Sequence, residues 1–116
     1  MSFEWKKYIE LAEKIVKNND KEEYLRTAVS RAYYGIFCIA RDKKGLTNQS
    51  STIHKRVKDA YLNSNLNSEQ EIGRILNLLR RNRNNADYDN TVTISKSLAE
   101  RCVLKAKYCL NLLNNL

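Results

Sequence analysis

Residues 76–89, which read LNLLRRNRNNADYD, begin as an apolar helix and end in a cluster of arginine and asparagine followed by Ala-Asp-Tyr-Asp. The apolar side chains before and within this stretch recur every three or four residues, which predicts a helix from about Glu69 to Tyr88. Desolvating several guanidinium groups is unfavourable unless each finds a partner, so the cluster either faces water or binds an anion. We therefore interpret the end of this helix as the functional end of the protein, and expect the other helices to hold it.

The rest of the chain has the same helical spacing. The second predicted helix is apolar around much of its circumference, which indicates a central position, and its small residues Ala28, Ala32 and Gly35 would permit close approach of another helix. Without proline and with mostly short connections, residues 1–116 predict one all-α domain, an up-and-down bundle of about five helices. The other four predicted helices run from about Ser2 to Lys17, from about Lys21 to Lys43, from Thr52 through Tyr61, and onward from Thr93 or Ser95.

The composition of the chain argues against a membrane or secreted protein and favours an anionic partner. No apolar run approaches the ~18 residues that cross a bilayer, and the N-terminus lacks the apolar stretch of a signal peptide, so we expect a cytoplasmic protein with no membrane association. The three cysteines, Cys38, Cys102 and Cys109, lie in apolar helical patterns and are expected to be reduced core thiols. A net charge of +8 favours a polyanionic partner, although the same charge would also serve solubility.

Helical spacing predicts which face of the helix each residue of the cluster occupies. Arg81, Asn85 and Tyr88 fall on one face, whereas Arg83 continues the apolar stripe and is expected to be partly buried, with Asp87 four residues later as its carboxylate. The only histidine, His54, is either a phosphate contact or acid/base group, or simply a residue that caps and packs its helix. A lone histidine without companion ligands is a poor metal site, so no metal and no cofactor are expected.

Three blocks of the sequence resemble the small prokaryotic HEPN domains, in particular the subgroup whose motif ends in Ala-Asp-Tyr. The blocks are residues 30–37 (SRAYYGIF), His54-Lys55, and residues 83–89 (RNNADYD). The resemblance spans nearly the whole chain and implies a helical bundle that forms a homodimer. Many members of the wider family are metal-independent ribonucleases, often toxins paired with a nucleotidyltransferase antitoxin.

The resemblance does not decide whether Arg81 or Arg83 is the arginine of the family motif. Catalytic HEPN members carry an Arg followed by a polar residue and, after four to six variable residues, a His. Counted from Arg83, the polar residue is Asn84 and Tyr88 stands where the His would be; counted from Arg81, the polar residue is Asn82 and Ala86 replaces the His. In both registers the catalytic His is missing, and a Tyr with a pKa near ~10 is a poor base at pH 7.

The sequence therefore predicts an HEPN-type domain that binds RNA or a nucleotide and is a candidate metal-independent ribonuclease or toxin. Two alternatives stay open: a non-catalytic interaction module that docks a nucleotidyltransferase-like partner, and a bundle whose basic surface only confers solubility. The candidate catalytic residues are Arg83, Tyr88 and Asp87, and the candidate substrate-binding residues are Arg81, Asn84 and His54.

Overall fold

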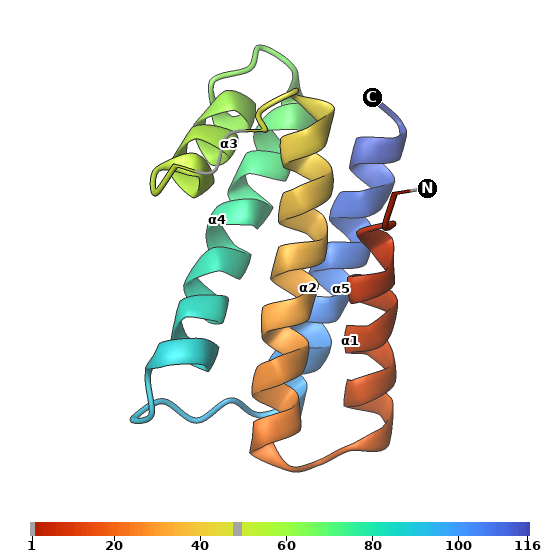
Figure 1. Cartoon of the computed structure of the whole chain (residues 1–116), viewed down its shortest axis with the longest axis vertical. Helices are drawn as coiled ribbons and strands as arrows, with labels where there is room; N and C mark the ends of the chain where they lie inside the picture. Colours follow the sequence, from red (N-terminus) through yellow and green to blue (C-terminus); the bar gives the residue numbers. More distant parts are fainter. Residues whose placement is uncertain (1, 48–49) are drawn as a thin grey trace.

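The computed structural model describes residues 2–47 and 50–116, and within them every regular element is an α-helix (Figure 1). The prediction of an all-α bundle is therefore confirmed. The helices are α1 (Lys6–Asn18), α2 (Glu22–Lys43), α3 (Ile53–Leu62), α4 (Asn67–Tyr88) and α5 (Lys96–Asn114).

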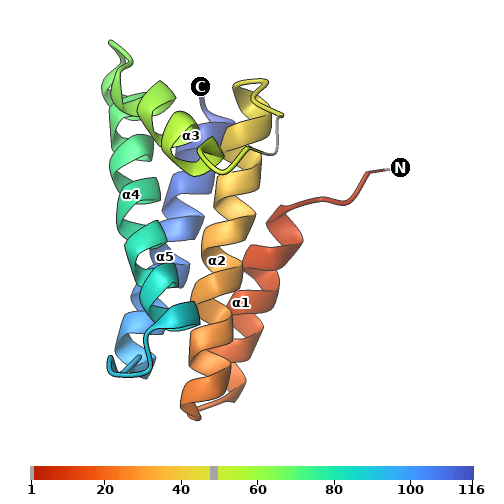
Figure 2. The same cartoon turned by 60° about the vertical axis from the view of Figure 1, so that its left-hand side comes forward.

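Four of the helices form an up-and-down bundle, and α3 is a short helix at the end where α2 finishes and α4 begins (Figures 1 and 2). The α2 helix contacts each of the other four, whereas α1 packs only against α2 and α5, and α3 only against α4 and α2. The α2 helix is therefore central in the bundle, as its apolar pattern predicted.

The contact between α1 and α2 is close because of a glycine. A Cβ atom at Gly35 would lie 2.8 Å from Cγ1 of Ile9 and 3.1 Å from the backbone oxygen of Trp5. Both Ala28 and Ala32 are fully buried. The small residues of α2 therefore permit the close approach that their sequence pattern predicted.

The ends of the helices differ in detail from the predictions. The first helix begins at Lys6, so Ser2 lies outside it. The fourth begins at Asn67, two residues before the predicted start. At the fifth helix the choice between two caps is resolved, because the Ser95 hydroxyl accepts a hydrogen bond from the backbone N–H of Leu98 at 3.1 Å. These shifts leave the arrangement of the bundle unchanged.

None of the helices in the described part of the chain has the length and apolar character that crossing a membrane would require.

Candidate anion-binding site

The second half of α4 turns one arginine of the cluster into the bundle. Arg83 is 5% exposed, and its guanidinium carbon lies 5.4 Å from the ring centre of Tyr33 and 4.9 Å from that of Tyr34, both on α2. The ring of Tyr88, one helical turn further along α4, lies 5.8 Å from the same carbon. Three aromatic rings therefore surround this charge, at distances at which a cation is attracted to ring faces.

The polar partners of the buried arginine are incomplete. The nearest carboxylate oxygen, Oδ2 of Asp87, lies 4.0 Å from Nε of Arg83, which is too long for a hydrogen bond, and it accepts instead from the Ser30 hydroxyl at 3.1 Å. Within the described residues, Nε of Arg83 and Nε of Arg80 are both buried and have no hydrogen-bond partner. Buried donors of this kind are normally satisfied, so Arg80 and Arg83, three residues apart on α4, are the candidates to take up an acceptor.

A histidine from α3 reaches the same region. Nδ1 of His54 lies 2.5 Å from the Tyr33 hydroxyl, and its ring stacks on Phe37 at 4.2 Å between ring centres. Burial, followed by the positive charges of Arg80 and Arg83, lowers the pKa of His54 to about 4. Burial also raises the pKa of the Tyr33 phenol. At pH 7 both groups are therefore neutral hydrogen-bonding groups beside two cations.

The depressed pKa of His54 gives a testable pH dependence. In the unfolded chain this imidazole titrates near 6.5, whereas in the folded protein its pKa is about 4. Between these values the unfolded chain binds more protons at this position, so its contribution to the free energy of unfolding rises with pH over the window from about 4 to 6.5. We expect urea unfolding to show that the free energy of unfolding of the wild type, relative to that of His54→Gln, rises as the pH increases across this window. A difference that falls with rising pH would contradict the assignment.

The C-terminal turn of α4 is held in place by a residue of α2. One guanidinium nitrogen of Arg26, Nη1, donates to the carbonyl oxygens of Asn85, Ala86 and Asp89 at 3.1, 3.0 and 3.0 Å. Its other terminal nitrogen, Nη2, donates to the carbonyl of Val92. The last carbonyls of a helix lack partners within the helix, and Arg26 provides one for Ala86. It shares the Asn85 carbonyl with the backbone N–H of Asp89. Arg26 therefore fixes the turn that carries Asp87 and Tyr88.

The structure brings four of the six predicted site residues together where the second half of α4 faces the middle of α2. Arg83 lies inside, with Asp87 and Tyr88 beside it, although the Tyr88 side chain is otherwise 76% exposed. His54 joins the group through Tyr33, whose ring lies against Arg83 and whose hydroxyl contacts the imidazole. The expected burial of Arg83 and its proximity to Asp87 are both present.

The other two predicted residues, Arg81 and Asn84, are exposed to solvent. Arg81 contacts none of the three rings that surround Arg83, so of the two alternative registers it is Arg83 that the fold places in a protein environment.

Sequence reasoning did not assign roles to Tyr33, Ser30 or Arg26. Tyr33 and Ser30 belong to the SRAYYGIF block on α2, and this block was the available signal. Arg26 carried no such signal, because its acceptors are backbone carbonyls about sixty residues later in the chain.

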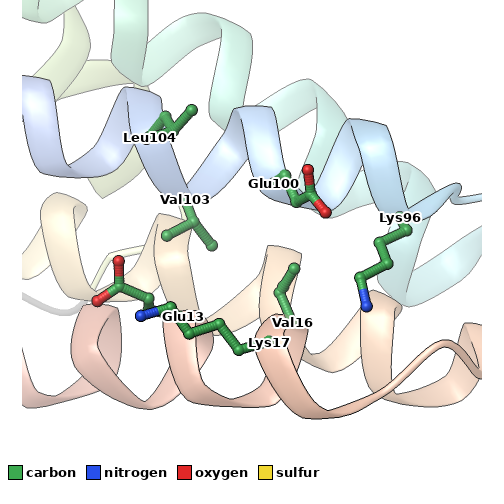
Figure 3. A pocket seen from close by; sticks show the side chains of 7 residues that line it. All are labelled: Glu13, Val16, Lys17, Lys96, Glu100, Val103 and Leu104. Atoms are coloured by element: carbon green, nitrogen blue, oxygen red, sulfur yellow. The ribbon is translucent and has the colours of Figure 1, made fainter.

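A concavity of about 390 Å³ opens between α1 and α5, away from Arg83 (Figure 3). Two glutamates and two lysines line it above apolar side chains, so its lining has no net charge and gives an anion no preference. The lining residues are Glu13, Val16, Lys17, Lys96, Glu100, Val103 and Leu104. The region of Arg83 is the better candidate, since its charges are unbalanced.

In the part of the chain that the structure describes, no three His, Cys, Asp or Glu side chains gather closely enough to hold a metal ion. A comparison with protein families finds that the family model described as HEPN domain matches residues 5–116. Searches of curated proteins and of solved structures found no significant match.

Proposed function

Because the chain belongs to the HEPN domain family, we propose that it binds RNA or a nucleotide by holding a phosphate group at Arg80 and Arg83, in the second half of α4. The observation that carries the proposal is the pair of buried arginine nitrogens, on Arg80 and Arg83, that have no acceptor in the described part of the chain. A phosphate offers several acceptor oxygens and the charge that this pair lacks. The net charge of +8 would favour the approach of such a ligand.

The same groups support binding more strongly than cleavage. Cleaving RNA through its 2′-hydroxyl needs a base that removes a proton, and an effective base has a pKa near the working pH. The pKa of His54 is about 4, and that of Tyr33 is raised above its ordinary value, so neither is matched to pH 7. The arginines could still stabilise developing negative charge. Burial is the largest cause of the low His54 pKa, and the positive charges of Arg80 and Arg83 add to it. A bound phosphate would offset those charges and raise the pKa, and we propose this as the route by which a ribonuclease or toxin activity would arise.

Binding can be tested directly with fluorescently labelled RNA and with adenosine monophosphate. We expect RNA to bind at low salt and the logarithm of its association constant to fall linearly with the logarithm of the salt concentration, with a slope of about −0.7 for each phosphate contacted. The same samples, kept in EDTA and analysed on denaturing gels, would reveal metal-independent cleavage. Absence of binding by both ligands at low salt would refute the proposal.

A second candidate function is docking of a nucleotidyltransferase-like partner, and the position of Tyr88 favours it. This side chain is 76% exposed and borders an open hollow of about 500 Å³ that Arg26, Asp87 and Asp89 also line. A partner that modifies nucleophilic side chains would reach this phenol without unfolding the helix. Incubation with a nucleotidyltransferase and ATP, followed by mass spectrometry, would reveal a mass increase that Tyr88→Phe abolishes. The homodimer that the sequence resemblance implies is likewise a proposal, tested by sedimentation.

A further inference from the structure

Rings and guanidinium groups continue from the phosphate site along α2 to the start of α1. The ring of Tyr34 lies 4.9 Å from the guanidinium carbon of Arg83 and 5.1 Å from that of Arg31. Arg31 in turn lies 4.8 Å from the ring of Tyr8, whose centre is 5.2 Å from that of Phe3. Each member of the series is thus a direct neighbour of the next, although the series draws on α4, α2, α1 and the segment before α1.

We propose that this series binds single-stranded RNA that leads away from the Arg83 phosphate site, with bases stacked on its rings and phosphates beside its arginines. The inference rests on the proposed function, because it starts from a phosphate held at Arg83. It adds a binding surface that extends from that site to the residues before α1. We call the series the aromatic–arginine track; it comprises Phe3, Tyr8, Arg31, Tyr34 and Arg83.

The track is open to solvent along most of its length. Phe3 is 51% exposed, and Tyr8, Arg31 and Tyr34 are each half-buried, so their outer surfaces are available to a ligand. The residues before α1 extend away from the bundle rather than folding back over α2 (Figure 2). Only Arg83, where the track begins, is enclosed by protein.

The charge of Arg31 in the track is not balanced by a carboxylate, and Arg83 has one only at 4.0 Å, from Asp87. Two other arginines of α2 have close acidic partners: Arg26 pairs with Glu22 at 2.9 Å, and Arg41 with Asp42 at 2.9 Å. Arg31 has no carboxylate partner among the described residues and lies instead between two tyrosine rings. A ligand that satisfies the track must therefore supply both negative charge and flat aromatic surfaces, which is the combination that single-stranded nucleic acid presents.

A second copy of this chain suits the track less well. In a two-fold symmetric contact the same patch lies on both subunits, so the unpaired Arg31 groups would face a surface of like charge. Each copy also carries a net charge of +8. An acidic peptide would satisfy the arginines but would leave the rings without stacking partners.

The test compares ligands that reach only the phosphate site with ligands that reach the whole track. Adenosine monophosphate and single-stranded RNA of 4, 8 and 12 nucleotides would be titrated into the wild type and the variants Phe3→Ala and Tyr8→Ala. We expect wild-type affinity to rise with length, and each variant to weaken the 12-mer at least about 5-fold, the lower end of what loss of one stacked base costs. Monophosphate binding should change less than about 2-fold, because stacking beyond the first nucleotide is all that these variants remove.

Matched controls separate the track from general effects. Tyr108→Ala removes a ring that is 50% exposed on α5, and Arg101→Ala removes an exposed arginine of the same helix; both should leave the 12-mer unaffected. Tyr8→Phe keeps an aromatic ring at this position of the track and should retain most of the affinity for the 12-mer. Circular dichroism would establish that each variant folds. If Tyr8→Ala does not fold, Phe3→Ala still tests the track, because Phe3 lies outside the helices.

The outcomes distinguish the two proposals. Monophosphate binding with no gain from longer RNA, or a 12-mer indifferent to both track variants, would overturn the track and leave the phosphate site standing. A 12-mer sensitive to the track without monophosphate binding would support the track and refute the phosphate site. If Tyr8→Ala halves the mass of the protein in solution and leaves its RNA affinity unchanged, the track contacts a second copy of the chain. That result would also overturn the track proposal.

Discussion

Replacing Arg83 with methionine is expected to remove most of the affinity for adenosine monophosphate while leaving the bundle at least as stable as the wild type. The guanidinium is 5% exposed, its nearest carboxylate oxygen is 4.0 Å from Nε, and that Nε has no hydrogen-bond partner among the described residues. A buried charge with incomplete partners destabilises a fold, and an apolar side chain of similar size is often neutral or stabilising in its place. A hydrogen bond to a charged group contributes about 1.5–3 kcal/mol, so binding should weaken about 10- to 150-fold.

Calorimetric titration and thermal unfolding of the same samples would measure the two effects. Arg74→Met is the matched control, because Arg74 is on the same helix but its side chain is 59% exposed and pairs only with Glu71. It should change neither quantity appreciably. A marked loss of stability in Arg83→Met with unchanged binding would mean that Arg83 serves the fold alone.

Replacing Arg26 with alanine is expected to destabilise the protein by about 2–4 kcal/mol, since several hydrogen bonds from one charged group are lost together. The guanidinium donates to carbonyls at the end of α4 and in the connection to α5, and its side chain is 22% exposed. Once it is removed, the carbonyl of Ala86 loses this donor, and that of Asn85 keeps only the backbone N–H of Asp89. The last turn of α4 also loses the cation that complements its dipole. Urea unfolding at pH 7 measures the change in the free energy of unfolding.

A second effect of the same substitution separates positioning from general stability. The turn that Arg26 holds carries Asp87 and Tyr88, whereas the buried part of α4 lies further from it. Hydrogen exchange should therefore accelerate most in the last turn of α4. Arg26→Lys, with a single point charge, should recover only part of the stability. Uniform acceleration across the bundle would show that Arg26 does not act on this turn in particular.

Much of the fold could be predicted because each helix carries its own periodic pattern. The helix through Ile72, Ile75 and Leu79 is an example, since these side chains fix both its existence and its buried face. Helix ends were less predictable. The α4 helix, for example, begins at Asn67, two residues earlier than its pattern indicates.

The candidate site was predictable only where its members lie on one helix. The burial of Arg83 and its closeness to Asp87 follow from their spacing along α4. The pairing of Tyr33 with His54 joins residues of α2 and α3, and no periodicity within either helix specifies it. The incomplete satisfaction of the arginine nitrogens depends on the three-dimensional surroundings of Arg83, which a sequence pattern does not reveal.

The three cysteine thiols of this protein are free and buried in the bundle. Burial raises the pKa of Cys38 above its ordinary value, that of Cys102 to about 11 and that of Cys109 to about 12. Peroxides, alkylating reagents and disulfide exchange act on the thiolate, which is scarce at these sites at neutral pH. The folded molecule is therefore indifferent to oxidative stress at cysteine, and the nucleophiles become reactive only in molecules whose interior has opened.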